Sequence, residues 1–172
     1  MKQLRLLSQY NRKSMPVKWS DYFTVVSMKD KYHVVVQYEP DSYLSTLRNS
    51  KFDKKRINKR ISSYDFDDES FSNIVQQFLK YGFKVTNVDW DDKTKSRISD
   101  EFDFDGVDLV ADFDSAINNI IHIVPRGMQV ITKLTFSGKN DSRLKISRYG
   151  VVTILNTDEE KDIISAVKDV LL

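Results

Sequence analysis

The segment "MQVITKLTFSGKNDSRLKISRYGVVTIL", residues 128–155, decides the fold class. Apolar and polar residues alternate on either side of the turn residues "SGKND", as they do in strands with one buried face. Gly150 marks a second turn, and "VVTIL" follows as a third strand. The segment therefore predicts a three-stranded antiparallel meander. The first strand places these residues on its buried face: Met128, Val130, Leu134 and Phe136.

Helices are predicted on both sides of this meander. The box "TDEE" at 157–160 can satisfy free amides at the start of a C-terminal helix. Upstream, "DDESFSNIVQQFLKYG" (67–82) repeats apolar residues at helical spacing, and Gly82 stands where a left-handed capping residue belongs. The two expected apolar faces are Phe71, Ile74, Val75, Phe78 and Leu79, and Ile163, Ile164, Val167, Val170 and Leu171.

The N-terminal half begins with a predicted β-hairpin, in which "YFTVVSM" (22–28) and "YHVVVQY" (32–38) are joined by "KDK". The remaining predicted elements are helices over 41–49, 52–61 and 116–124 and strands over 83–90 and 106–113, with a polar loop over 91–105. We therefore expect an α+β fold of antiparallel β-meanders packed against helices, with an N-terminal β-hairpin. A chain of 172 residues predicts a single domain, 1–172, in which lobes 1–82 and 83–172 are conceivable.

The composition excludes several classes of protein. The chain contains no cysteine, so it has no disulfide, no thiolate nucleophile and no cysteine-ligated metal. The start "MKQLRLLSQYNRK" lacks the apolar run of a signal peptide, and the most apolar stretches are far shorter than the ~20 residues that cross a bilayer. We expect a soluble cytoplasmic protein. The sequence leaves open whether residues 1–20 fold alone or only on binding.

The net charge of +2 hides a strong segregation of charge along the chain. Residues 1–62 carry +9, residues 63–114 carry −9, and residues 115–172 carry +2. Charge asymmetry of this kind is an argument about partners rather than about fold. The alternative is that the two blocks neutralise each other within the folded protein.

The densest positive segment lies between residues 48 and 60, immediately before a cluster of acids. The acids need no function, because anions at a helix start interact favourably with its free amides. The cations form either a solvated face or a surface for an anionic partner. With two aromatic candidates for exposed anchors, the predicted partner-binding residues are Arg48, Lys51, Lys54, Lys55, Arg56, Lys59, Arg60, Phe66 and Trp90.

A second positive surface is predicted on the C-terminal meander. Strand alternation turns its polar residues away from the buried face, and a sheet face that carries cations beside an aromatic can follow a nucleic-acid backbone. The alternative is a face that merely keeps the protein soluble. The residues of this predicted nucleic-acid face are Lys133, Arg143, Lys145, Arg148 and Tyr149.

The acidic stretch "DEFDFDGVDLVADFD" (100–114) suggests a site for Mg²⁺ or Ca²⁺ through Asp103, Asp105 and Asp108. As a calcium loop it fails at the first and twelfth positions, where Glu101 and Asp112 are the wrong acids. As a nuclease it fails because Ile131 precedes Lys133 where a carboxylate is needed. We predict no metal and no other cofactor.

Other catalytic patterns are missing. The chain has neither a nucleophile elbow nor a glycine-rich phosphate loop, and its two histidines, His33 and His122, have no partner at metal-ligand spacing. The leading hypothesis is a non-catalytic inhibitor or regulator that docks through a charged surface onto a host protein or a protein–nucleic-acid complex, as an accessory protein of a phage or mobile element would. The alternatives are a metal-dependent nuclease or phosphotransferase using 100–114 and a direct nucleic-acid-binding protein.

Overall fold

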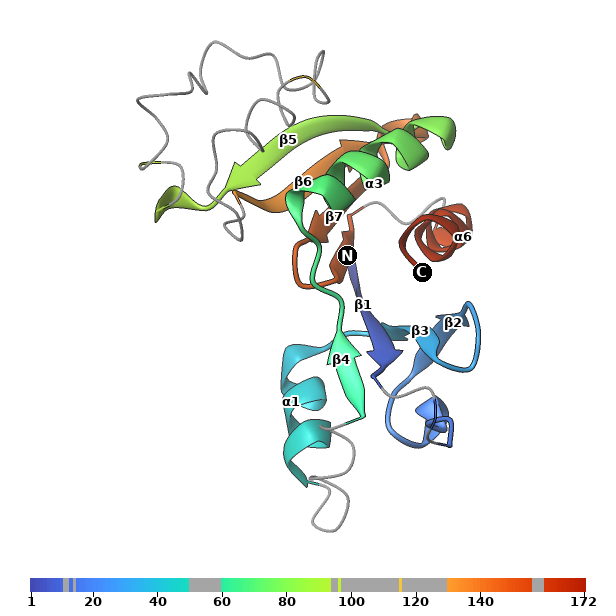
Figure 1. The fold of residues 1–172 in the computed structure, drawn as a ribbon. Helices are drawn as coiled ribbons and strands as arrows, with labels where there is room; N and C mark the ends of the chain where they lie inside the picture. Colours follow the sequence, from blue (N-terminus) through green and yellow to red (C-terminus); the bar gives the residue numbers. More distant parts are fainter. Residues whose placement is uncertain are drawn as a thin grey trace. The chain divides into compact units, whose positions relative to one another are not determined.

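The computed structural model describes residues 1–10, 13, 15–49, 60–93, 96, 115, 130–155 and 160–172, with the side chains of 48 and 49 excepted. The described residues form an α+β fold with antiparallel strand pairing (Figure 1). The chain divides into two compact units, which we call unit 1 (Met1–Asp65 and Tyr149–Leu172) and unit 2 (Phe66–Arg148). Among the described residues, no helix combines the length and the apolar character needed to cross a membrane.

The sheet of unit 1 is built around strand β1 (Lys2–Gln9). Strand β3 (His33–Gln37) pairs with one edge of β1, while β8 (Val151–Ile154) and β4 (Ile61–Ser63) pair with different lengths of the other edge. Strand β2 (Val25–Met28) pairs with β3 and completes the predicted hairpin. All of these pairs are antiparallel.

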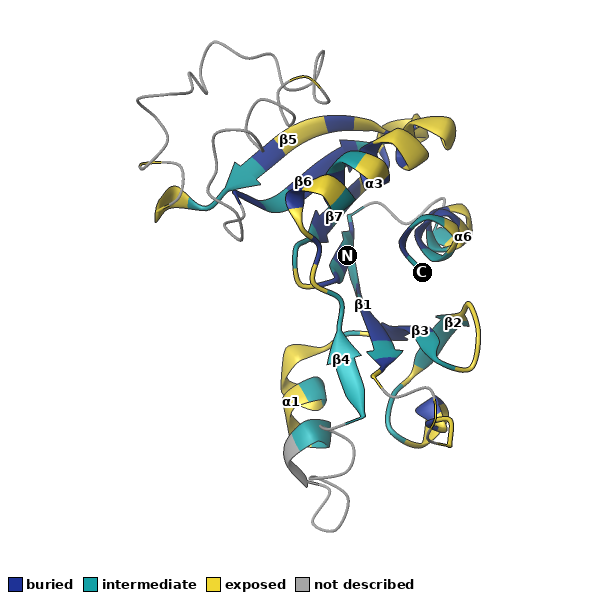
Figure 2. Ribbon diagram, in the orientation of Figure 1, coloured by how far each residue is buried: buried dark blue, intermediate teal, exposed yellow. Residues whose placement is uncertain are grey.

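Both faces of this sheet are buried around β1 and β3, which Figure 2 colours largely as buried. On one face Leu7, Val34 and Val36 pack with Val17 and with Trp19 of the short 3-10 helix η1 (Trp19–Asp21). The register turns a second set to the opposite face, and each of its members is fully buried. That second set is Leu4, Leu6, Val35, Val152 and Ile154.

Two helices belong to unit 1. Helix α1 (Pro40–Asn49) begins at a proline, whose missing amide hydrogen costs nothing in the first turn. Helix α6 (Glu160–Leu171) contacts β2 and buries Ile163, Ala166, Val167 and Leu171. An ion pair between Lys2 and Glu160 joins the start of β1 to the start of α6.

Unit 2 contains the strands β5 (Lys84–Trp90), β6 (Ile131–Ser137) and β7 (Arg143–Ser147), paired in that order. The 3-10 helix η2 (Lys139–Asp141) connects β6 to β7. Helix α3 (Asp68–Lys80) lies along one face of the sheet and contacts β5 and β6 (Figure 1). The ring of Phe78 lies 5.1 Å from that of Phe136 and 5.6 Å from that of Phe83, so aromatic packing fixes the helix on the strands.

Most of the predicted elements within the described residues are confirmed. These are the β2–β3 hairpin, α1, α3, β5, β6, β7, β8 and α6. Gly82 has φ of +81° and ends α3, as predicted. The predicted helix over 52–61 is wrong at Ile61, which belongs to β4; residues 51–59 lie outside the described residues. The capping box and the elements expected over 106–113 and 116–124 fall outside them too, apart from Ser115 and Glu160.

Candidate functional site

The solvated face of the sheet of unit 2 gathers polar side chains from three strands. Residues that stand opposite each other in an antiparallel pair project to the same face. The register pairs Lys133 with Asp89 and Ser147, Thr135 with Asn87 and Lys145, and Ser137 with Lys84 and Arg143. We call these nine residues the basic sheet face.

Lys84, Asn87 and Arg143 of this face are exposed and Thr135 at its centre is buried, while the opposite face carries the core of unit 2. Leu134, Phe136, Leu144 and Ile146 alternate with the polar residues and are fully buried. The sheet therefore follows the strand rule, in which one parity faces the core and the other faces water, except at Thr135, which is 9% exposed.

Positive charge dominates the basic sheet face. It carries the cations Lys84, Lys133, Arg143 and Lys145 against a single carboxylate, Asp89. Asp89 forms an ion pair with Lys133 at 2.6 Å and accepts a hydrogen bond from the Asn87 amide at 2.8 Å. Within the described part of the chain, the other three cations have no carboxylate partner.

The structure brings together three of the five residues predicted for the nucleic-acid face, namely Lys133, Arg143 and Lys145. Arg148 is half-buried at the end of β7, and its backbone N–H donates to the Thr132 carbonyl at 2.8 Å. Tyr149 is 60% exposed but belongs to unit 1. Neither Arg148 nor Tyr149 is among the nine positions of the face.

Sequence reasoning missed the contribution of β5 to this face. A bulge between Val85 and Asn87 inserts one residue, so the buried Val85 and Val88 are three positions apart instead of two. Simple alternation from Lys84 would place Thr86 on the basic sheet face and Asn87 on the buried face, whereas the register places Asn87 on the basic sheet face. The spacing of the two valines is a signal of the bulge in the sequence.

Of the predicted cationic cluster of the N-terminal half, the structure describes the side chain of Arg60 alone. Lys51, Lys54, Lys55, Arg56 and Lys59 lie outside the described residues, and only the backbone of Arg48 is described. Arg60 donates a hydrogen bond from its guanidinium to the carbonyl oxygen of Met15, so its own chain holds this side chain.

One of the two predicted aromatic anchors, Phe66, is buried, so the prediction that it is exposed is wrong. Phe66 is only 7% exposed, and its ring lies 5.9 Å from that of Phe71. It is buried because the first apolar residue of α3 packs against it. Trp90 is half-buried at the end of β5, opposite Ile131, and its role in binding stays a prediction.

The acids before α3 divide into two roles. Asp67 is the N-cap, and its carboxylate accepts from the Ser70 N–H at 2.7 Å; hydrogen bonding to Ser70 lowers the pKa of Asp67 below 3.8. The buried carboxylate of Asp68 instead accepts from the N–H groups of Val130 at 3.1 Å and Ile131 at 3.0 Å. Burial raises the pKa of Asp68 above 3.8, against the lowering effect of these two donors. Asp68 is thus a link between the start of α3 and the start of β6.

The proposed metal ligands Asp103, Asp105 and Asp108 lie outside the described residues. Within the described ranges, no group of three or more His, Cys, Asp or Glu side chains is placed to hold a metal ion.

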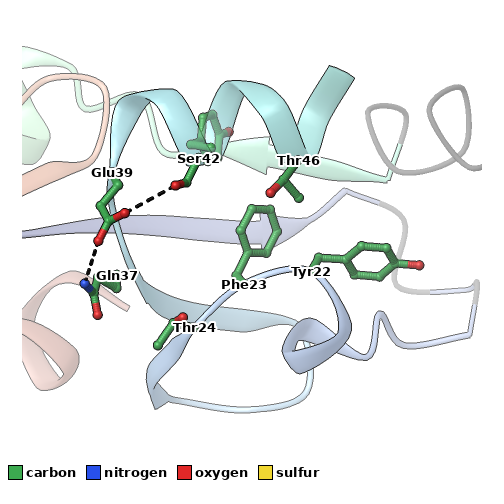
Figure 3. A pocket seen from close by; sticks show the side chains of 8 residues that line it. Tyr22, Phe23, Thr24, Gln37, Glu39, Ser42 and Thr46 are labelled. Carbon is green, nitrogen blue, oxygen red and sulfur yellow. Dashed lines mark hydrogen bonds between the residues drawn. The ribbon is translucent and has the colours of Figure 1, made fainter. Parts of the chain in front are cut away.

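Unit 1 contains a small pocket with a volume of about 150 Å³ (Figure 3). It lies between the turn before β2, the end of β3 and the first turns of α1. Glu39 accepts hydrogen bonds from the Gln37 amide at 3.0 Å and from the Ser42 hydroxyl at 3.2 Å. The residues that line the pocket are Tyr22, Phe23, Thr24, Gln37, Glu39, Ser42, Tyr43 and Thr46.

Comparison of the chain with known proteins supplies no relative. No protein-family model, no curated protein and no solved structure matches it. The basic sheet face and the pocket of unit 1 are therefore the two candidate sites within the described part of this chain.

Proposed function

We propose that this is a non-catalytic binding protein that docks onto the phosphate backbone of a nucleic acid, alone or within a protein–nucleic-acid complex, through the basic sheet face. The observation that supports it is a cation cluster that the carboxylates of the described residues compensate little. Lys84, Arg143 and Lys145 share one sheet face and have no carboxylate partner among the described residues.

The spacing of these cations suits a row of phosphates. Residues i and i+2 on one strand, such as Arg143 and Lys145, are about 6.8 Å apart, and neighbouring strands lie about 4.8 Å apart. Successive phosphates on one strand of a nucleic acid are separated by a similar distance. The hydroxyl of Ser137 and the second N–H of the Asn87 amide stand between the cations and add hydrogen-bond donors for phosphate oxygens.

The face predicts binding that depends little on nucleotide sequence. None of the nine positions is aromatic, so the face offers no ring on which bases could stack, and its charged groups contact phosphates. Contacts to phosphate position a protein on the strand but carry no base information. With about three phosphate contacts, the slope of log affinity against log salt concentration is about −2 to −3.

Fluorescence anisotropy with labelled single strands and duplexes of mixed sequence tests the proposal. Changing Lys84, Arg143 and Lys145 to Gln removes three positive charges from the face, and we expect affinity at low salt to fall by roughly tenfold or more, with a flatter salt dependence. The matched control changes Lys18, Lys29 and Lys31, three exposed lysines of unit 1, to Gln and removes the same net charge elsewhere. We expect this control to change affinity far less.

Two results would overturn the proposal. One is equal weakening by both triple variants, which would show a diffuse attraction to the whole chain. The other is no measurable binding of any oligonucleotide by the unaltered protein at low salt. Unfolding curves of the variants serve as the folding check, because exposed substitutions of this kind change stability by less than about 0.5 kcal/mol.

A further inference from the structure

The pocket of unit 1 is large enough to hold the terminal functional group of a side chain. A cavity of about 150 Å³ accommodates a molecule the size of benzene. Several of its wall residues, including Thr24, Glu39 and Ser42, are exposed, so a ligand can enter while the rest of its structure stays in solvent. The pocket therefore suits a group of a few heavy atoms carried on a chain.

The residues that line the pocket contribute a net negative charge. Glu39 is the one Asp or Glu among its lining residues, and no Lys, Arg or His lines it. Its carboxylate takes part in no ion pair with the other residues that the structure describes. The hydrogen bonds from Gln37 and Ser42 occupy about two of its roughly four acceptor positions, which leaves acceptors for a ligand.

Aromatic rings form much of the remaining wall. Phe23 and Tyr43 are stacked, with centroids 5.9 Å apart and planes inclined by 26°. In Figure 3 the side chain of Thr46 points from α1 toward the ring of Phe23. Ring faces carry negative charge density, so they attract a cation as the carboxylate does.

The same aromatic cluster already holds one guanidinium. Arg5 of β1 lies with its guanidinium carbon 4.4 Å from the ring centroid of Tyr43 and 5.0 Å from that of Tyr38. Two of its N–H groups donate to the hydroxyl of Ser63 in β4, at 3.2 and 2.8 Å. These bonds hold the Arg5 guanidinium against β4, and Arg5 is not among the residues that line the pocket. A cation–π contact of a guanidinium with these tyrosines is therefore part of the structure of unit 1.

We infer that the pocket bounded by Phe23, Glu39 and Tyr43 is a binding site for a guanidinium group, supplied by an arginine side chain of a partner polypeptide or by a small free guanidine. A planar guanidinium can stack on a ring while it donates to a carboxylate edge, whereas an ammonium is a point charge with a tightly held water shell. An anion is disfavoured by Glu39. This inference does not depend on nucleic-acid binding by unit 2.

The test is an NMR titration that follows the amide signals of unit 1 with N-acetyl-arginine amide as the probe. We expect saturable binding in the millimolar range, with shifts concentrated at Phe23, Glu39 and Tyr43. The neutral isostere N-acetyl-citrulline amide should bind roughly tenfold more weakly or worse, and N-acetyl-lysine amide more weakly than arginine amide. The tripeptide Gly-Arg-Gly separates the two sources: retained affinity indicates a polypeptide ligand, and lost affinity indicates a small free guanidine.

The substitution Glu39→Gln removes the charge and keeps the size of the side chain, and we expect it to weaken arginine amide binding by roughly tenfold. Glu69→Gln, the same change at an exposed position of α3, is the matched control and should leave the affinity unchanged. The backbone carbonyl of Glu39, which accepts from the Tyr43 N–H at 2.8 Å, is untouched, so helix α1 is retained. Equal binding of arginine and citrulline amides, or no effect of Glu39→Gln, overturns the inference.

Discussion

The sheets of the two units obey different burial rules. In unit 1, consecutive residues Leu6 and Leu7 of β1 are both fully buried, because structure covers both faces of the strand. In unit 2, Leu134 of β6 is fully buried while its neighbour Lys133 lies on the basic sheet face. A sheet with one solvated face can present a row of side chains to a partner, and the docking surface that we propose for unit 2 depends on this property.

The largest expected effect tests this contrast directly. Leu6→Ala and Leu7→Ala should each lower the free energy of unfolding by about 2–5 kcal/mol, because each leaves a cavity on a buried face. In β6, Leu134→Ala should cost a similar amount, whereas Lys133→Ala should cost less than about 1 kcal/mol, the value of an exposed ion pair. Denaturant unfolding followed by circular dichroism measures all four. A Leu6 or Leu7 variant as mild as Lys133→Ala would show that one face of β1 is not covered.

A smaller effect compares one glycine from each unit. Gly150 and Gly82 both have positive φ, +70° and +81°. A Cβ at Gly150 would lie 2.9 Å from the Cβ of Tyr64, whereas at Gly82 the nearest atom is the end of Lys139 at 3.9 Å. We expect Gly82→Ala to cost about 1 kcal/mol from backbone strain alone and Gly150→Ala about 2 kcal/mol or more from strain plus overlap. Equal costs in thermal unfolding would mean that Tyr64 moves aside freely.

The smallest effect concerns the pH dependence of two neighbouring acids in unit 2. The pKa of Asp67 is lowered, so its stabilising contribution is present above the unfolded value near 3.8 and is lost as pH falls through the folded pKa. The pKa of Asp68 is raised, so its contribution is present at low pH and is lost as pH rises above 3.8 through the folded pKa. The stability lost in Asp67→Asn, about 1 kcal/mol or less at neutral pH, should therefore shrink on acidification.

For Asp68→Asn, the pH trend should have the opposite sign. The stability lost relative to the unaltered protein should grow on acidification, on top of a constant cost of about 1–3 kcal/mol because Asn leaves one of the two N–H groups of Val130 and Ile131 without an acceptor. Urea unfolding across acidic pH measures both variants. The same sign of pH trend in the two variants would contradict the opposite pKa shifts.

The sequence predicted the elements whose pattern is local. Helix α3 was legible because Phe71, Ile74, Val75 and Phe78 repeat at helical spacing and Gly82 can adopt a left-handed conformation. Leu79, which was predicted on the same buried face, is 51% exposed. The β2–β3 hairpin and the strands of the C-terminal segment were legible because β-branched residues or alternation mark them.

Strand β1 was not predicted, although it is the centre of unit 1. Its "LRLL" does not alternate, because a strand buried on both faces needs apolar residues at both parities. It also contains no β-branched residue that would mark it as a strand. The sequence gives no sign that this segment pairs with β3, β4 and β8, which lie far along the chain. The position of Phe66 was misjudged for a related reason: its acidic neighbours indicated exposure, whereas in the fold it is buried and its ring packs against Phe71.

The candidate sites were accessible to sequence reasoning in part. Alternation along β6 and β7 identified Lys133, Arg143 and Lys145, but the β5 residues of the same face depend on an inter-strand register that includes a bulge. The pocket of unit 1 was not foreseen, because its walls come from the turn before β2, from β3 and from α1.

By itself, the sequence determined the α+β class, the helix and strand segments with local periodicity and the absence of cysteine chemistry. The tertiary structure decided which strands pair, which face of each sheet meets water and which side chains from distant segments stand together. The physical reason is that periodicity encodes the conformation of one segment and the parity of its buried residues. Strand pairing and burial depend instead on what the rest of the chain places against that segment, and a single segment carries no record of its neighbours.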